Sequence, residues 1–460
     1  MTGLRSSSAS VKGSLPLTLN TCLHICAAFS SARALSLEPN LYFLDALSLI
    51  HISKLDPRSH YQRFVNGFKL RRRVKSMSIQ LTDEQLMIQS MVRDFAREVI
   101  APTAGERDKT KEFPADNLRQ LAELGFMGMM VPPEYGGSGA DTISYVLALS
   151  EVAYACASTA VVMSVHNSIV CESILRYGSE DQKKEWLTRL ATGEILGAFA
   201  LTEPQAGSDP VRQSTKAIRD SDSYILNGTK RFITTASNAG LTIVTTKTDE
   251  AARHRGITAF LVPKETPGLF IGQLEDKMGL RASDTADLIF EDCRIPAENM
   301  LGKEGEGFKI AMTGLDGGRI GIASQSVGVA QAALDASIEY AKQREQFGQT
   351  ISKFQGLRWI VADMATELEA ARQLMLSAAA MKDRGINYTR QASMAKLYAS
   401  EMVNRVTAKA VQLHGGYGYI REYPVERMYR DARVFTIYEG TSEIQRVVIS
   451  NHLFQDKRTP

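Results

Sequence analysis

The sequence predicts a mainly α-helical protein with a central β domain, because the pattern of apolar residues changes twice along the chain. Helical spacing of apolar residues covers about 80–195 and returns at about 305–455, whereas the stretch between them has short runs rich in Val, Ile, Thr and Phe. The 460 residues suffice for two or three packed units. We expect an extension over 1–76, a helical domain over 77–195, an antiparallel β domain over 196–300 and a second helical domain over 301–460.

The composition excludes several classes of function. With 54 basic and 51 acidic residues, the net charge is +3, so no concentrated basic face for nucleic acid is expected. The five cysteines are odd in number and mostly far apart, which favours a reducing compartment over a disulfide framework. Cys22 and Cys26 have the spacing of a metal-binding pair, but no second Cys/His pair accompanies them, so no metal site is expected. No run of about 18 apolar residues occurs, so no membrane span is expected.

The first 76 residues have two interpretations. They contain no acidic residue before Glu38, are rich in serine and carry scattered basic residues, as in a mitochondrial transit peptide. Alternatively, the folded protein begins at Met77, after the basic cluster Arg71-Arg72-Arg73, and the preceding stretch is a disordered or artefactual extension. The second interpretation predicts a bacterial-type cytoplasmic protein, and the first predicts the mitochondrial matrix.

The first helix of the N-terminal helical domain is expected to begin at a capping box and to end at a proline. Thr82 and Gln85 have capping-box spacing, apolar residues then recur every 3.6 residues, and Pro102 cannot continue the hydrogen-bond ladder. Further helices are predicted over 115–125, 141–155 and 162–192.

The central segment reads as short strands. Tyr224-Ile225-Leu226 and Arg231-Phe232-Ile233 flank Asn227-Gly228, which predicts a β-hairpin with a tight turn. Further strands are predicted over 241–247, 256–262 and 288–290.

The C-terminal segment predicts long helices over 306–343, 355–384 and 389–413. The first carries four glycines, each of which costs about 1 kcal/mol in a helix interior. They indicate either the close approach of a ligand or another chain, or tight helix packing. These glycines are Gly314, Gly317, Gly318 and Gly321.

Common catalytic and nucleotide motifs are absent from the sequence. No GxGxxG follows a strand, and GxxxxGK[ST], HExxH and GxSxG do not occur, which disfavours a Rossmann site, a P-loop and common hydrolases. Four glycine- or hydroxyl-bearing loops remain, each of which could contact a planar or anionic ligand or be an ordinary turn, strand, helix cap or surface loop. They are 199–209, 232–235, 412–418 and 438–443.

Taken together, these loops resemble the acyl-CoA dehydrogenase family, and the resemblance runs from about Leu81 to His452. The stretch 277–285, Lys-Met-Gly-Leu-Arg-Ala-Ser-Asp-Thr, belongs to the same pattern. The resemblance implies an N-terminal helical domain, a middle antiparallel β domain and a C-terminal four-helix bundle. It also implies an FAD whose ring lies between the β domain and the C-terminal helices, in a homotetramer built as a dimer of dimers.

The resemblance implies the following contacts. Phe232 stands where many relatives have tryptophan, and this departure keeps an aromatic side chain beside the flavin. Thr234 would lie near flavin N5. Within one subunit the FAD would contact Phe199, Leu201, Thr202, Gly207, Ser208, Phe232, Ile233, Thr234, Thr441, Ser442 and Glu443. A neighbouring subunit would supply Arg344, Phe347, Gln355, Gln412, Leu413, Gly415 and Gly416. The substrate would contact Ser208, Asp316, Arg319 and Gly440.

The same resemblance implies that Glu439 is the catalytic base. One subgroup carries its base just before the arginine of a Leu-Asp-x-x-Arg run, and here Gly318 fills that position in Leu315-Asp316-Gly317-Gly318-Arg319. Read alone, Asp316 and Arg319 favour a charge pair on a helix surface, whereas with the resemblance they favour contact with the CoA moiety.

The expected reaction is the α,β-dehydrogenation of an acyl-CoA. The runs 315–325 and 163–168 look most like short-chain members, which favours short or short branched acyl groups. An electron-transfer flavoprotein is the expected electron acceptor. The alternatives are an acyl-CoA oxidase, which would tend to carry a larger C-terminal region, and a non-catalytic scaffold on the same fold.

Overall fold

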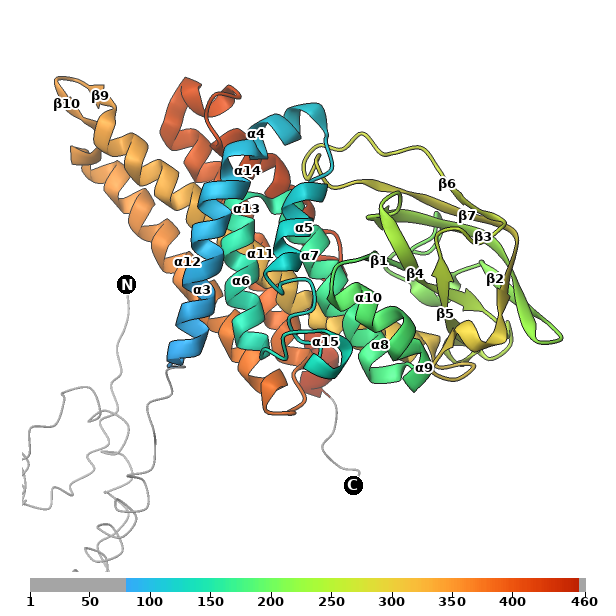
Figure 1. Ribbon diagram of the computed structural model, residues 1–460. Coiled ribbons are helices and arrows are strands. Elements are labelled where there is room, and N and C mark those ends of the chain that lie inside the picture. The colour runs from blue at the N-terminus through green and yellow to red at the C-terminus, as the bar shows by residue number, and fades with distance from the viewer. Residues whose placement is uncertain (1–79, 455–460) are drawn as a thin grey trace, which may run out of the picture. The chain divides into compact units, whose positions relative to one another are not determined.

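The computed structural model describes residues 80–454, arranged as helices, then a β sheet, then helices again (Figure 1). This order confirms the predicted mainly α fold with a central β domain. The extension 1–76, with Cys22 and Cys26, lies outside the described residues.

The first helical stretch begins as predicted but does not end at Pro102. Thr82 and Gln85 form the capping box of α3 (Asp83–Phe95). A π-helical turn (Ala96–Ile100) follows, and the stretch continues through α4 (Ala101–Thr110). In the π turn the Ala101 N–H bonds back to the Ala96 carbonyl, so Pro102 falls in the first turn of α4, where its missing N–H costs little.

The predicted helix 162–192 is interrupted. It comprises α7 (Ala157–Ser164), a π turn (Val165–Cys171) and α8 (Glu172–Tyr177), and then stops at Gly178. A new capping box at Ser179 starts α9 (Glu180–Gln182), which leads through a π turn (Lys183–Leu187) to α10 (Thr188–Ala191). The other helices of this domain are α5 (Ala115–Glu123) and α6 (Thr142–Ala155), as predicted.

One apolar run in this domain has the length and composition of a membrane span. Ala157–Tyr177 reaches a mean hydropathy of 1.2, but 89% of that window is buried inside the structure. Such burial is what a core helix of a folded domain shows.

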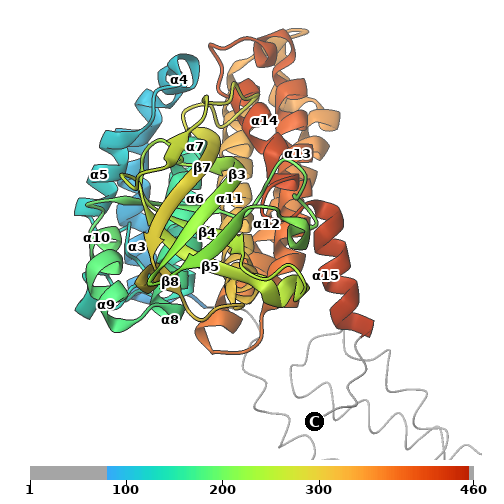
Figure 2. The same cartoon turned by 90° about the vertical axis from the view of Figure 1, so that its right-hand side faces the viewer.

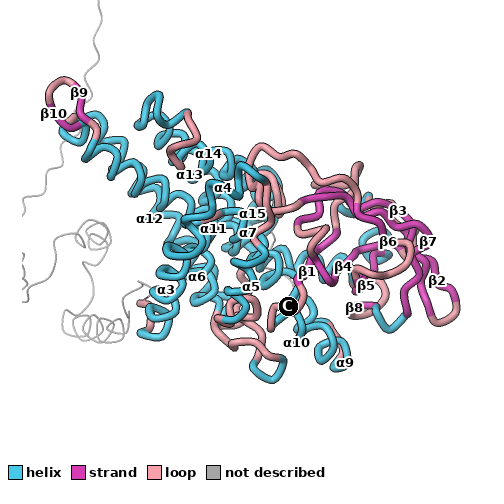
Figure 3. The backbone as a smooth tube through the Cα atoms, turned by 45° about the horizontal axis from the view of Figure 1, so that its top comes forward, coloured by secondary structure: helices cyan, strands magenta, loops and turns pink. Residues whose placement is uncertain are grey.

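The strands of the β domain, magenta in Figure 3, form one mixed, mostly antiparallel sheet. Its strand order is β6-β7-β3-β2-β4-β5-β8. Two pairs are parallel: β1 with β4, and β2 with β4 through the single residue pair Lys216 and Lys247. The other pairs in the sheet are antiparallel. Helix α11 and the π turn Val165–Cys171 contact the sheet (Figure 2). The strands are β1 (Leu196–Ala200), β2 (Lys216–Asp220), β3 (Ser223–Thr234), β4 (Ala239–Lys247), β5 (Ile257–Pro263), β6 (Leu269–Ile271), β7 (Thr285–Pro296) and β8 (Met300–Leu301).

The predicted hairpin turn at Asn227-Gly228 is wrong, because β3 runs straight through it. The pairing of β3 with β7 shifts register between Leu226 and Gly228, and Gly228 has a φ of 143°. The Asn227 side chain donates to the Asp292 carboxylate (3.0 Å) and accepts from the Asp292 N–H (2.8 Å). The dipeptide therefore lies opposite a bulge whose extra residue is on β7, at Glu291 and Asp292. The hairpin turn lies at Ser221 and Asp222, between β2 and β3.

The C-terminal helices form a bundle in which α13 contacts α11, α12 and α15. Their bounds are α11 (Gly307–Gln343), α12 (Gln355–Asp383), α13 (Thr389–His414), α14 (Val425–Ala432) and α15 (Ser442–Phe454), and a short hairpin of β9 (Glu345–Gln346) and β10 (Gln349–Thr350) joins α11 to α12. The predicted helices 306–343, 355–384 and 389–413 are thus confirmed to within a residue.

Candidate active site

Glu439 lies in a strained turn that leads into α15. Both Glu439 (φ 53°) and Gly440 (φ 90°) have left-handed backbone conformations, which a non-glycine residue rarely adopts. The side-chain amide of Gln445 donates to the carbonyls of Glu439 (3.2 Å) and Gly440 (2.9 Å). The Tyr438 hydroxyl donates to the Gln325 side-chain oxygen at 2.8 Å, which ties the turn to α11. Such strain persists only where the surroundings hold it, and it concentrates at functional sites.

One oxygen of the Glu439 carboxylate is shielded from solvent, although the residue as a whole is half-buried. This Oε2 atom has no hydrogen-bond partner among residues 80–454. Burial raises the pKa of Glu439 to about 7, although the positive charges of Lys396 and Arg319 oppose the shift. A carboxylate with such a pKa is a competent proton acceptor at neutral pH.

Gly318 makes room for this carboxylate on α11. A Cβ atom at Gly318 would lie 1.9 Å from Oε2 of Glu439. By contrast, a Cβ at Gly321 would meet the Ser164 hydroxyl at 2.4 Å, a contact between helices. Both glycines thus make room for side chains of the same chain, as tight packing predicts, whereas the approach of a ligand or another chain stays a prediction.

We expect Gly318→Ala to impair the site while the fold survives. Alanine favours a helix by about 1 kcal/mol over glycine, so the cost comes from the displaced carboxylate. A displacement of about 1 Å can reduce kcat/KM roughly a hundredfold. Gly356→Ala in α12 is the matched control, because no atom of residues 80–454 outside its own stretch of helix lies within 4 Å of the added Cβ. Equal steady-state kinetics for the two variants would contradict this placement of the carboxylate.

Asp316 and Arg319 form the ion pair that their spacing allows, but the pair is not on the surface. The Arg319 guanidinium donates to Asp316, and the Arg319 side chain is 5% exposed. The Thr389 hydroxyl donates to the other Asp316 oxygen at 2.6 Å. Asp316 is the more accessible partner, and Arg319 also faces Glu439, whose charge it stabilises.

The loop 199–208 is anchored by a buried ion pair. The Lys230 ammonium on β3 donates to the Glu203 carboxylate (2.8 Å), to the Leu201 carbonyl (3.1 Å) and to Gln213 (2.8 Å). Both side chains of the pair are at most 1% exposed. Burial raises the pKa of Glu203, but Lys230 and the hydrogen bonds from Ser214 and Thr215 outweigh it, so the pKa lies below its usual range. The Arg231 N–H bonds to the Thr202 carbonyl (2.8 Å), which joins this loop to the 232–234 segment.

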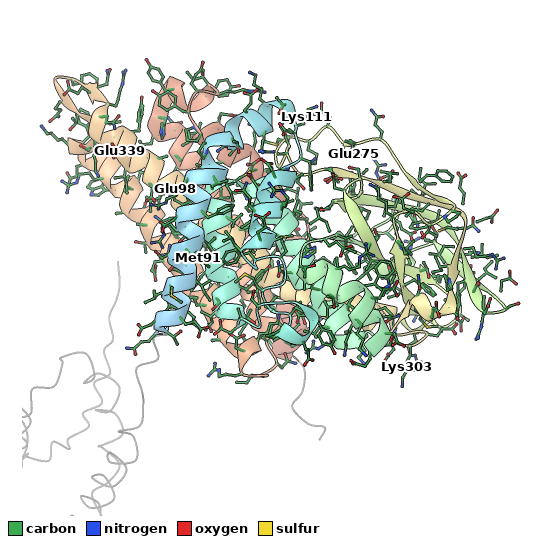
Figure 4. The ribbon with its side chains drawn as sticks, in the orientation of Figure 1. Met91, Glu98, Lys111, Glu275, Lys303 and Glu339 are labelled. Carbon is green, nitrogen blue, oxygen red and sulfur yellow. The ribbon has the colours of Figure 1, made fainter. Side chains whose placement is uncertain are left out.

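The surface beside this loop fits a planar heterocycle. Phe232 is 56% exposed and has a φ of 58°, and the Arg231 guanidinium carbon lies 4.7 Å from its ring centre. Arg231 is in turn held by Asp287 (2.7 Å) and by Glu275 (3.0 Å), which is labelled in Figure 4. Gly207 is exposed, and apart from its own chain neighbours no atom of residues 80–454 lies within 4 Å of a Cβ added there. Exposed aromatic surface beside a polar loop is what a flavin ring can cover.

Of the remaining residues predicted near the cofactor, Ile233 is buried in the sheet and Thr234 and Phe199 are partly buried. At the start of α15, the Thr441 hydroxyl accepts from the Ile444 N–H (3.3 Å), and Glu443 is exposed. The buried Ser442 hydroxyl has no partner among the described residues.

The residues predicted to serve a neighbouring subunit gather elsewhere, at the far end of α11. A hollow of about 540 Å³ there is lined by Arg344, Phe347, Leu413, Gly415 and Gly416, among others. Phe347 is 93% exposed, and Arg344 lies over the Tyr417 ring at 5.4 Å. Gln355 and Gln412 are exposed but do not line the hollow.

Helix α11 separates this hollow from Glu439. At about 1.5 Å per residue, the helix places Arg344 roughly 39 Å from Gly318. Glu339, labelled in Figure 4, marks the end of α11 next to β9 and β10.

Three residues that build the site were not among the predicted site residues: Lys230, Lys396 and Gln445. Lys396 could have been found, because it lies on the apolar stripe of α13 among Ala392, Ala399 and Val403, where a lysine is unusual. Lys230 carries a weaker signal, since charged residues are common in exposed strands.

Comparison with known proteins places this architecture in a family. Family models match the acyl-CoA dehydrogenase N-terminal domain over residues 82–194, the middle domain over 198–293 and the C-terminal domain over 305–454. The chain belongs to the acyl-CoA dehydrogenase family, whose members are FAD flavoproteins.

Among its relatives, the rat mitochondrial short-chain specific acyl-CoA dehydrogenase is 49% identical over 382 residues, which cover 83% of this chain and 93% of the relative. The structure of butyryl-CoA dehydrogenase from Megasphaera elsdenii is 46% identical, with a TM-score of 0.81, covering 82% of this chain and all of that one. A chain in a structure described as the electron transferring flavoprotein of Acidaminococcus fermentans is 48% identical, with a TM-score of 0.82, covering 83% of this chain and all of that one. The chain is thus an acyl-CoA dehydrogenase.

Proposed function

We propose that this acyl-CoA dehydrogenase oxidises short-chain or short branched-chain acyl-CoA to the trans-2-enoyl-CoA, with Glu439 taking the α-proton. The observation that carries the proposal is the shielded, unpartnered Oε2 atom of Glu439 above Gly318. A buried carboxylate without a donor is costly, so it is expected where a ligand or a reaction uses it.

The residues around the sheet are suited to hold the FAD. Phe232 would cover the ring, with Ile233 and Thr234 along the same edge, and the 199–208 loop would bond its polar side through Thr202 and backbone groups. Thr441, Ser442 and Glu443 would contact it from the start of α15. The bound flavin supplies an acceptor for the β-hydride of the substrate.

The chain itself would handle the proton. The α-proton of a thioester is weakly acidic, so the carbonyl must be polarised by a donor such as the backbone N–H of Glu439. The pKa of about 7 keeps a useful fraction of Glu439 ionised near neutral pH, and the carboxylate becomes neutral when it takes the proton. Asp316 and Arg319, with Ser208 and Gly440, would contact the CoA-linked part of the substrate.

The assembly would be a homotetramer built as a dimer of dimers. The hollow at Arg344, Phe347, Leu413, Gly415 and Gly416, with Gln355 and Gln412 beside it, would bind the FAD of a neighbouring subunit, because α11 holds it far from the same chain's Glu439. An electron-transfer flavoprotein is the proposed acceptor, supported by the similar chain from Acidaminococcus fermentans. Placement in the cytoplasm or the mitochondrial matrix depends on residues 1–76 and stays a prediction.

An anaerobic titration with saturated acyl-CoAs of graded length tests the substrate class. We expect butyryl-CoA or a branched short acyl-CoA to bleach the flavin absorbance most strongly. Strongest bleaching by a long-chain substrate would contradict the short-chain proposal. Bound flavin that no acyl-CoA bleaches would contradict the proposed reaction, and rapid reoxidation by air would favour an oxidase.

A further inference from the structure

Lys396 is a buried cation beside the turn that carries Glu439. It lies on α13, is 0% exposed and forms no ion pair within residues 80–454. Its ammonium donates to the Gly440 carbonyl at 2.7 Å. Because burying a lysine without a paired carboxylate is costly, a specific role for this side chain is expected.

Lys396 and Gln445 hold the same carbonyl from two helices. Gln445 on α15 donates to Gly440 at 2.9 Å, while Lys396 approaches from α13. The Gly440 peptide is therefore fixed on two sides, directly after the strained Glu439. Since the backbone on both sides of Cα aims a side chain, these two donors determine where the Glu439 carboxylate lies.

Lys396 also acts on Glu439 through its charge. Two cations face the carboxylate, Lys396 from α13 and Arg319 from α11, and both stabilise its ionised form. The neutral phenols of Tyr145 on α6 and Tyr438 face it as well. Lys396 in turn faces Arg319 and the carboxylates Glu443 on α15 and Glu401 on α13.

We propose that Lys396 is a positioning residue for Glu439. Lys396 aims the Glu439 carboxylate over Gly318 by holding the Gly440 carbonyl, and its charge favours the ionised form of that carboxylate. This inference rests on the proposed role of Glu439 as the base. Burial lowers the pKa of Lys396 to about 8, so the side chain still carries its charge at pH 7.

Three variants separate the two effects. Lys396→Met removes both the donor and the charge, and Lys396→Gln removes the charge but keeps a donor. Gln445→Met removes a donor and leaves the charge in place. Lys409→Met is the matched control, because Lys409 lies on the same helix but pairs with Glu367 at 3.2 Å on the outer side, with its side chain 31% exposed.

The first measurement is the pH profile of kcat/KM. Without the Lys396 charge, the apparent pKa of the base should rise by about one unit or more in both Lys396 variants. Gln445→Met should leave that pKa in place and lower the limiting rate at high pH, by roughly ten- to a hundredfold. Lys409→Met should match the unmodified enzyme.

The second measurement follows the carboxyl band of protonated Glu439 by infrared difference titration, with Glu439→Gln as the reference, and needs no turnover. An unchanged pKa of Glu439 in Lys396→Met, even with lowered thermal stability or flavin content, would overturn the inference and leave Lys396 a structural residue. If Glu439→Gln itself remained active, the proposed base would fall instead, so the two failures are distinguishable.

Discussion

Glu439→Gln is expected to lower kcat/KM by roughly 10²- to 10⁴-fold, the range that a general base contributes. The amide has the shape of the carboxylate but cannot accept the α-proton. Because Oε2 of Glu439 has no hydrogen-bond partner in the part of the chain that the structure describes, the substitution breaks no bond there. Flavin content and thermal stability should therefore stay near those of the unmodified enzyme. Steady-state kinetics with butyryl-CoA, alongside flavin absorbance, measure both expectations.

Glu265→Gln is the matched control for this substitution. Glu265 is exposed on the loop between β5 and β6, so its loss should change neither turnover nor flavin content. Turnover of Glu439→Gln within a few-fold of this control would remove Glu439 as the base. Loss of flavin in Glu439→Gln would show instead that the carboxylate has a structural role.

Lys230→Met is expected to lower the free energy of unfolding by about 3–5 kcal/mol, because it leaves the Glu203 carboxylate buried and without its cation. Glu203 would keep only the donors of Gln205, Ser214 and Thr215, among them the Thr215 N–H at 3.0 Å. The loop that contains Thr202 should loosen as a result, so weaker retention of FAD is expected together with the loss of stability. Urea unfolding and flavin release on dilution measure the two effects.

The double variant Glu203→Gln with Lys230→Met provides the internal test. Replacing both charges of a buried pair costs less than removing one, so the double variant should recover part of the lost stability. Lys216→Met is the surface control, because its pair with Glu250 (2.6 Å) is more than half exposed and should contribute about 1 kcal/mol or less. A loss for Lys230→Met no larger than this control's would contradict the anchoring role of the pair.

The sequence predicted the elements well where one periodicity ran without interruption. The helices α11, α12 and α13 and the strands β4 and β5 have long, consistent patterns, and their predicted bounds differ from the structure by at most two residues. The predictions failed at Pro102 and at Asn227-Gly228. Proline was expected to end the helix at Pro102, but a π turn lets the helix continue. Asn-Gly was expected to form a hairpin turn, but the pairing of β3 with β7 keeps the strand extended there.

The site could be predicted only as far as its residues form motifs. Glu439, Phe232 and the 199–208 loop were predicted in this way. The positive φ angles of Phe232 and Glu439, and the donors that sustain the turn at Glu439, depend on segments far apart in the chain. Lys396 and Gln445 meet at one carbonyl only because α13 and α15 pack together, which no local pattern reveals.

The length of α11 has a genetic consequence if each site draws on two chains, as proposed. Each chain would supply Glu439 to its own site and Arg344 to the site of a neighbouring subunit. A mutation at Glu439 would therefore disable a different site from a mutation at Arg344 in the same chain. Co-expression of two such inactive mutants would then yield mixed assemblies in which one site has an intact Glu439 from one chain and an intact Arg344 from the other. The two alleles should complement each other, whereas two alleles that both damage Glu439 should not.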